Sequence, residues 1–133
     1  MHFVGLDLAW GQRKPTGVAV VDDSGRLVSA SAATDDASIR AAVGTYTEGE
    51  CVVGIDAPIV VTNPSGQRPA ERAPNADFAR FQAGAHPSNT GKPEFAPGTR
   101  AGRLADDLEL DIDPHGGRPR RAIEVYPHAA TVA

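Results

Sequence analysis

Three apolar, strand-like segments of this chain each carry one acidic side chain where a buried strand would be expected to carry an apolar one. The segments are residues 4–9 (VGLDLA), 53–58 (VGIDAP) and 122–125 (AIEV). The acids are Asp7, Asp56 and Glu124, and the small residues two positions before them are Gly5, Gly54 and Ala122. Because side chains alternate between the two faces of a strand, each acid shares its face with that small residue, which leaves room for a ligand to approach.

An unpaired carboxylate is costly to bury, so acids in a sheet are usually paired, metal-bound or placed at a strand end that faces a cleft. We therefore predict that Asp7, Asp56 and Glu124 meet as a metal-binding acidic cluster. Oxygen ligands suit Mg²⁺ or Mn²⁺ better than zinc, and two such ions about 4 Å apart would promote phosphodiester hydrolysis by activating water and stabilising the leaving oxygen. Asp7 and Asp56 are the core of this site, with Glu124 as a supporting ligand or general base. The alternative is that each acid accepts backbone amides or pairs with an arginine.

The middle of the chain offers candidates for contacts with a substrate. Residues 57–105 carry 6 basic and 3 acidic side chains, whereas residues 1–56 carry 4 basic and 8 acidic ones. The predicted phosphate contacts are Arg72, Arg80, Ser88 and Asn89. Solvated arginines and a flexible loop are the alternative. His86 and His128 are either acid–base groups or polar surface residues.

The hydrophobic pattern predicts the elements that would position these residues. Strands are expected at residues 2–10, 16–22, 26–32, 51–55 and 122–126, with a helix over about residues 34–49. The first three strands, joined by short turns, should form an antiparallel meander. Its first strand should be central because it is apolar on both faces, and its more polar third strand should lie near an edge. The helix makes a crossover, so the fourth strand should pair in parallel with the meander.

The segment between the fourth and fifth strands is the least regular. Pro74 is expected to stop a short helix over about residues 70–73, and Asn75 to cap a second helix. Residues 83–98, rich in Gly and Pro, are expected to be a lid, a binding loop or disordered. The aromatic residues expected in the core are Trp10, Phe78 and Phe81.

Length and composition set the broad class. The 133 residues predict a single domain over residues 1–133, with an irregular insertion at about 62–117. The only cysteine, Cys51, is expected to be buried and has no partner for an intramolecular disulfide, which suits a reducing compartment. Without a run of about 18 apolar residues or a signal-peptide pattern, the chain is expected to be soluble, cytoplasmic and free of membrane. The net charge of −4 argues against a strongly basic nucleic-acid binder, although the positive middle of the chain qualifies this.

The motifs VGLD, GIDAP and EVYP, together with the segment from Arg72 to Arg80, resemble the family called domain of unknown function 429. That family is a predicted-nuclease branch of the ribonuclease H-like superfamily, and the resemblance runs from residue 3 to the end of the chain. It implies a ribonuclease H-like α/β fold, in which a mixed five-stranded sheet (an antiparallel three-strand meander plus two parallel strands) is flanked by helices. It also implies a nuclease with nucleic acid as its partner.

Related nucleases carry a further carboxylate on a helix after the fifth strand. This chain ends shortly after Glu124, so we expect that C-terminal helix to be truncated. The chain is then a fragment, or a second chain completes the site, or the site is not catalytic.

Two other functions fit the same pattern. Sugar kinases and actin-like ATPases share the meander and an early aspartate, and there the turn at residues 11–14 would cradle nucleotide phosphates. A non-catalytic domain would instead bind nucleic acid or a protein partner, with a homo-oligomer covering its open sheet edge. The sequence lacks the glycine-rich motifs of dinucleotide-binding and P-loop sites and the Cys/His motifs of zinc sites, which argues against these three functions.

Overall fold

The computed structural model describes residues 1–132, which form two compact units. In chain order the elements are β1 (His2–Asp7), β2 (Thr16–Asp22), β3 (Leu27–Ala33), α1 (Asp36–Thr47), β4 (Cys51–Ile55), α2 (Pro69–Phe78), the 3-10 helix η1 (Ala79–Phe81), α3 (Arg100–Asp107), β5 (Arg120–Glu124) and the 3-10 helix η2 (Pro127–Thr131). The sheet unit is Met1–Ile59 with Arg100–Val125, and the loop unit is Val60–Thr99 with residues 126–132. All five strands, α1 and α3 belong to the sheet unit.

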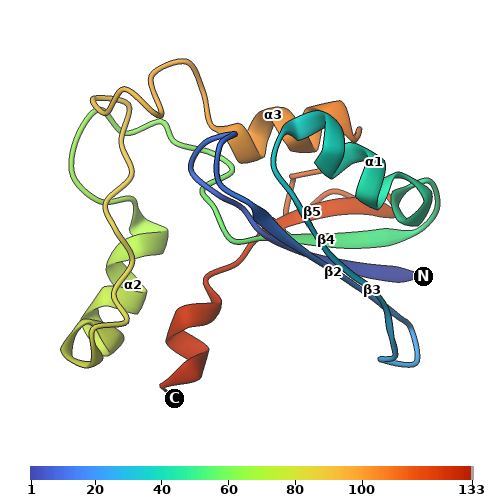
Figure 1. The fold of residues 1–133 in the computed structure, drawn as a ribbon. Coiled ribbons are helices and arrows are strands. Elements are labelled where there is room, and N and C mark those ends of the chain that lie inside the picture. The colour runs from blue at the N-terminus through green and yellow to red at the C-terminus, as the bar shows by residue number, and fades with distance from the viewer. Residues whose placement is uncertain (133) are drawn as a thin grey trace. The chain divides into compact units, whose positions relative to one another are not determined.

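The strands form one mixed sheet in the order β3-β2-β1-β4-β5 (Figure 1). β2 pairs antiparallel with both β1 and β3, whereas β4 pairs parallel with both β1 and β5. The predicted α/β fold, with a three-strand meander plus two parallel strands, is therefore confirmed. The central place of β1, the edge place of β3 and the parallel pairing of β4 after the α1 crossover are also as expected.

One face of the sheet packs against α1 and α3, which lie on the same side of it in Figure 1. The core of the sheet unit consists of alternate strand residues (Val4, Leu6, Val18, Val20, Val53, Ile55 and Ala122) and helix residues (Ile39, Val43, Ala101, Leu104 and Ala105). Cys51 is fully buried here, as predicted, and burial raises the pKa of its thiol. α1 begins with a capping box, in which Asp35 accepts the backbone N–H of Ser38 and the Ser38 hydroxyl oxygen accepts the backbone N–H of Asp35.

The opposite face of the sheet is apolar but exposed. Phe3 of β1 is 40% exposed and Ile123 of β5 is 47% exposed. β1 is thus apolar on both faces, as its sequence indicates, yet the helices of the sheet unit cover only one of them. The outer edge of β5 is partly occupied by Asp111, whose backbone N–H donates to the Arg120 carbonyl at 2.9 Å and whose carbonyl accepts the Ala122 N–H at 2.9 Å.

Helix α2 differs from the prediction, because Pro74 lies inside it and Asn75 continues it instead of capping a new helix. A proline in a helix interior removes one backbone hydrogen bond without necessarily ending the helix. Here the second half of α2 gains another bond, since Asn75 Nδ2 donates to the Ala85 carbonyl at 3.0 Å. No helix within residues 1–132 has the length and apolar content needed to cross a membrane.

Two aromatic residues lie outside the core, contrary to the prediction. Trp10 follows β1 in a turn and is 65% exposed. Phe81 is 48% exposed, and the Arg80 guanidinium lies 4.6 Å from the centre of its ring. Trp10 lies in a turn and Phe81 in a short 3-10 helix, and neither element packs its ring into the core. The hydrophobicity of the two residues did not indicate this.

Candidate functional site

Asp7 and Asp56 occupy matching positions on neighbouring parallel strands. β1 and β4 pair so that Leu6 faces Ile55, and Asp7 and Asp56 come next on each strand. The Asp56 N–H donates to the Leu6 carbonyl at 2.9 Å, so the hydrogen-bond ladder continues one residue beyond the end of β4. Neighbouring strands lie about 4.8 Å apart, and residues in register share a face. Asp7 and Asp56 therefore lie next to each other on the same face of the sheet.

The small residues before these acids leave space beside them. A β-carbon added at Gly5 would meet nothing within 4 Å. One added at Gly54 would contact Val125 at 3.4 Å, and one added at Gly17, which faces Asp7 from β2, would contact the Asp7 β-carbon at 3.4 Å. The sheet surface next to Asp7 is thus open over Gly5 and bounded by ordinary contacts on either side.

The two acids differ in what they contact. The Asp7 side chain is exposed and makes no hydrogen bond or ion pair with any other residue of the described chain. Asp56 is half-buried and already interacts within the chain. A cation that binds between them would contact the Asp7 carboxylate, which has no partner in the described chain, and the Asp56 carboxylate, which is held by its interactions.

Glu124 lies at the same end of the sheet but on its other face. It pairs with Ile55 across β4 and β5, so strand alternation places it on the core side, opposite to Asp56. Its Oε2 accepts the backbone N–H of Ile59 at 3.0 Å, which ties the segment after β4 to the end of β5. Residues 1–132 contain no group of three or more His, Cys, Asp and Glu side chains arranged to hold a metal ion. The register thus aligns Asp7 with Asp56 on neighbouring strands and places Glu124 on the opposite face of the sheet.

Arg100, the first residue of α3, organises the chain where it leaves β1. Its guanidinium donates to the carbonyls of Ala9 and Gly11 at 2.7 and 2.8 Å, and its Nε bonds the Asp36 carboxylate at 2.8 Å. The side chain is 10% exposed. Charge-assisted bonds from a nearly buried arginine fix the turn that follows Asp7. Sequence reasoning missed this role, since the only signal was the place of Arg100 among the basic residues of the middle of the chain.

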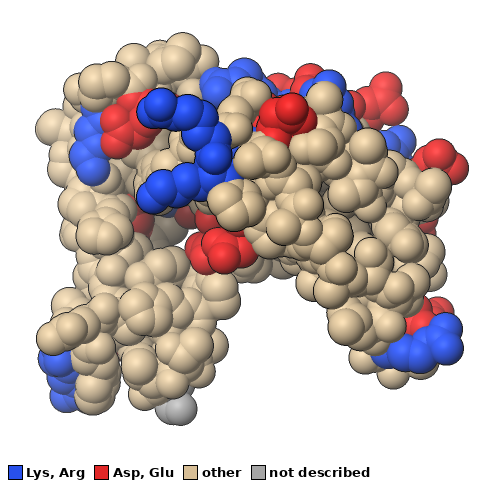
Figure 2. Space-filling model, in the orientation of Figure 1, with Lys and Arg blue, Asp and Glu red and all other residues tan. Residues whose placement is uncertain are grey.

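The turn between β1 and β2, residues 8–15, carries two cations. Arg13 and Lys14 are exposed, and neither forms an ion pair or hydrogen bond with another of the described residues. Figure 2 shows Lys and Arg side chains projecting from the region where Figure 1 draws this turn.

Ser88 and Asn89, predicted to contact phosphates, belong to a network around the buried Glu71 of the loop unit. The Glu71 carboxylate is 3% exposed and accepts the Ser88 N–H at 3.0 and 3.1 Å, the Arg68 N–H at 2.9 Å and the Arg68 Nε–H at 2.8 Å. Burial acts to raise the pKa of Glu71, but the hydrogen bonds from Ser88 and Arg68 outweigh it and hold that pKa below its ordinary value. Ser88 is itself 1% exposed, and Asn89 Nδ2 donates to the Gly66 carbonyl at 3.1 Å. In this structure both residues support the loop, and their contact with phosphate stays a prediction.

The other predicted contacts of the loop unit are on its surface. Arg72 is exposed and donates to the Gln67 carbonyl at 3.3 Å, and Arg80 is exposed beside Phe81. His86 and His128 are also exposed. All these residues lie in the loop unit, whereas the three predicted acids lie in the sheet unit.

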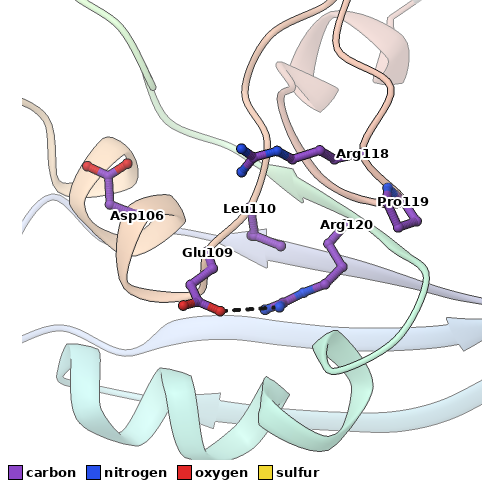
Figure 3. Close-up of a pocket in the computed structure, with 6 residues that line it drawn as sticks. All are labelled: Asp106, Glu109, Leu110, Arg118, Pro119 and Arg120. Carbon is purple, nitrogen blue, oxygen red and sulfur yellow. Dashed lines mark hydrogen bonds and ion pairs between the residues drawn. The ribbon is translucent and has the colours of Figure 1, made fainter.

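One pocket of the sheet unit, of about 570 Å³, contains none of the predicted residues (Figure 3). It is lined by Asp106, Glu109, Leu110, Arg118, Pro119 and Arg120. Arg120 Nη1 donates to Glu109 Oε2 at 3.4 Å, and Glu109 is 81% exposed, so this ion pair is screened by water. Arg120 begins β5, which places the pocket at the end of the parallel strands opposite to Asp7 and Asp56.

The model of a protein family described as "Protein of unknown function (DUF429)" matches residues 5–133. The match spans Asp7, Asp56 and Glu124. No curated protein and no solved structure matches the chain.

Proposed function

Since the chain belongs to the family described as protein of unknown function DUF429, a description that assigns no activity, we propose a function from the site itself: a divalent-metal-dependent, nuclease-like phosphodiester hydrolase. The observation that carries the proposal is the register of β1 and β4, which aligns Asp7 with Asp56 where both strands end. In open α/β sheets, ligands bind outside the carboxyl ends of the strands. The order β1-β2-β3-α1-β4, with one acid in β1 and another closing β4, supports a place in the ribonuclease H-like superfamily.

The donor set of this site fits Mg²⁺ or Mn²⁺. Two carboxylates on adjacent strands supply hard oxygen ligands, and Mg²⁺ is usually bound through one or two carboxylates, with water and substrate phosphates completing its shell. A pair of acids is therefore enough. A bound ion would polarise the phosphate and lower the pKa of a coordinated water. Zinc fits less well, because the single cysteine, Cys51, is buried in the core at the opposite end of β4.

The residues of the chain would divide the work as follows. Asp7, exposed and uncommitted, and Asp56, held by its contacts within the chain, would bind and orient the ion. Glu124 would act as a positioning residue, because its bond to the Ile59 N–H fixes the segment that leaves Asp56. Its role as a third ligand or general base stays a prediction. A nucleic-acid strand is the proposed substrate, with Arg72, Arg80, Ser88 and Asn89 as proposed further contacts.

The test is a nuclease assay with Mn²⁺ on the unmodified chain, on Asp7→Asn and on Asp23→Asn. Asp23 is a matched control, since it is 75% exposed and lies on the β2–β3 turn at the opposite end of the sheet. We expect Asp7→Asn to lower the rate by about 100-fold or more, as when one charge-stabilising group is removed from an active site, and Asp23→Asn to leave it unchanged. Hydrolysis that is equally fast in both variants would exclude the proposed site.

A further inference from the structure

We propose that Arg13 and Lys14, on the turn between β1 and β2, bind backbone phosphates of a nucleic-acid strand that lies across the Asp7–Asp56 pair. The inference deepens the proposed function and rests on it for the identity of the ligand. It assigns to this turn the task of attracting and aligning the strand, while the acids bind the metal ion.

The strand register places the two cations at the acidic end of the sheet. Asp7 faces Gly17 across β1 and β2, so residues 8–15 form the loop that closes the hairpin just beyond Asp7. The turn itself lies at Gln12 and Arg13, with Lys14 directly after it. The β2–β3 turn, by contrast, lies at the other end of the same strands.

Arg13 and Lys14 are also free to bind a ligand. Other arginines of the sheet unit are engaged: Arg40 pairs with Asp107, Arg100 with Asp36 at 2.8 Å, and Arg120 with Glu109 at 3.4 Å. Among residues 1–132, no acidic side chain pairs with Arg13 or Lys14. A phosphate would therefore displace only water from these two cations.

The turn that carries them is held in place before any ligand binds. Arg100 bonds the carbonyls of Ala9 and Gly11, and the Ala9 N–H donates to the buried Thr16 hydroxyl at 3.2 Å. Gln12 Nε2 donates to Asp36 Oδ2 at 3.1 Å, on the carboxylate that also binds Arg100. A fixed turn loses little conformational entropy on binding, so more of the phosphate interaction appears as affinity.

Electrostatics gives the turn a specific task. Asp7 and Asp56 repel an approaching phosphate until a cation is bound between them, and this repulsion extends over about 8 Å at physiological ionic strength. Two cations on the adjoining turn offset it and raise the local concentration of a polyanion. Phosphate contacts of this kind fix the register of a strand without reading its sequence.

The experiment measures binding and hydrolysis separately on the whole chain. Binding of a short fluorescein-labelled single-stranded DNA is followed by anisotropy in Ca²⁺ between about 50 and 200 mM salt, and hydrolysis in Mn²⁺. The variants are Arg13→Ala/Lys14→Ala, the charge-conserving Arg13→Lys/Lys14→Arg, and Arg26→Ala as a matched control. Arg26 is 80% exposed and follows the turn at the opposite end of the sheet. Thermal unfolding verifies that each variant is folded.

We expect the double alanine variant to bind about tenfold more weakly, and its dependence of log K on log salt to be shallower by about 1.4, which corresponds to two lost contacts on a single strand. The charge-conserving variant should retain most of the affinity, and Arg26→Ala all of it. Equal affinity of the double alanine variant and the unmodified chain would overturn the inference, as would no binding of DNA by the unmodified chain at low salt. Binding that depends on Arg13 and Lys14 without any hydrolysis would support the inference and overturn the proposed hydrolase.

Discussion

The carboxylates of Asp7, in the sheet unit, and Glu71, in the loop unit, differ in their exposure to solvent and in their hydrogen bonding. The Asp7 side chain is exposed and makes no hydrogen bond or ion pair within residues 1–132, whereas Glu71 is 3% exposed and accepts hydrogen bonds from Arg68 and Ser88. Asp7, which has no hydrogen-bond partner in that part of the chain and lies beside Asp56, can bind a ligand. Glu71, which is buried and hydrogen-bonded within the chain, can only stabilise the fold. Function and stability are thus expected to depend on different acids.

The largest stability effect should come from Glu71→Gln. The substitution leaves the guanidinium of Arg68, 11% exposed, without its carboxylate, and breaking one side of a buried ion pair costs about 3 kcal/mol. Asp7→Asn should change the free energy of unfolding by less than about 0.5 kcal/mol, because no contact of the fold is lost. Urea denaturation measures both, with Glu94→Gln as an exposed control from the same unit. A Glu71→Gln variant as stable as Glu94→Gln would contradict the structural role of Glu71.

The pH dependence of stability should separate the same two acids. Because the pKa of Glu71 is lower in the folded chain than its ordinary value of 4.5, its stabilising contribution is complete above that pH and is lost as the pH falls through the folded pKa. The difference in stability between the unmodified chain and Glu71→Gln should therefore shrink below pH 4.5. Urea midpoints measured from about pH 6 to about pH 3 give this difference. A constant difference over that range would show that the charge of Glu71 is not what stabilises the loop unit.

Ser88→Ala should have an intermediate effect. The variant loses the hydroxyl that bonds Glu71 but keeps the backbone N–H, so we expect the chain to be about 1 kcal/mol less stable. Amide hydrogen exchange at residue 88 should become faster, because the side chain is 1% exposed and packed within this network. A variant as stable as the unmodified chain would contradict this structural role, and weaker substrate binding at unchanged stability would assign Ser88 to the substrate alone.

The smallest effect on stability should come from Arg72→Ala. Arg72 is exposed and its one bond, to the Gln67 carbonyl, is long at 3.3 Å, so the change should stay below about 0.5 kcal/mol. Any loss of substrate affinity in this variant would then report a direct contact. A loss of stability comparable to that of Glu71→Gln would place Arg72 within the structural network.

The sheet could be predicted from the sequence because local patterns determine it. The runs at residues 16–22 and 51–55 became β2 and β4 with the expected bounds, and the α1 crossover set the parallel pairing. Helix α2 was harder to predict from the sequence. A proline lowers the stability of a helix, but the sequence does not show whether other contacts compensate for it. The helix continues past Pro74, and the next residue, Asn75, donates to the carbonyl of Ala85, which lies outside the helix.

The candidate site was only partly predictable. The pattern of a small residue two positions before an acid singled out Asp7 and Asp56 in the sequence, and the register of β1 and β4 aligns them. The face taken by Glu124 depends on how β5 pairs with β4, which the sequence of a single strand does not contain. Arg100 and Glu71 were missed for a related reason: their partners, Ala9 and Ser88, are distant in sequence.

The most direct test of the central claim is the binding of Mn²⁺, followed by electron paramagnetic resonance or calorimetry, to the unmodified chain, Asp7→Asn, Asp56→Asn and the double variant. If the two carboxylates share one ion, each single substitution should weaken binding by about tenfold or more, and the double variant should bind little more weakly than either single one. Asp23→Asn should bind like the unmodified chain. Binding that survives in the double variant with unchanged affinity would contradict a metal site between Asp7 and Asp56.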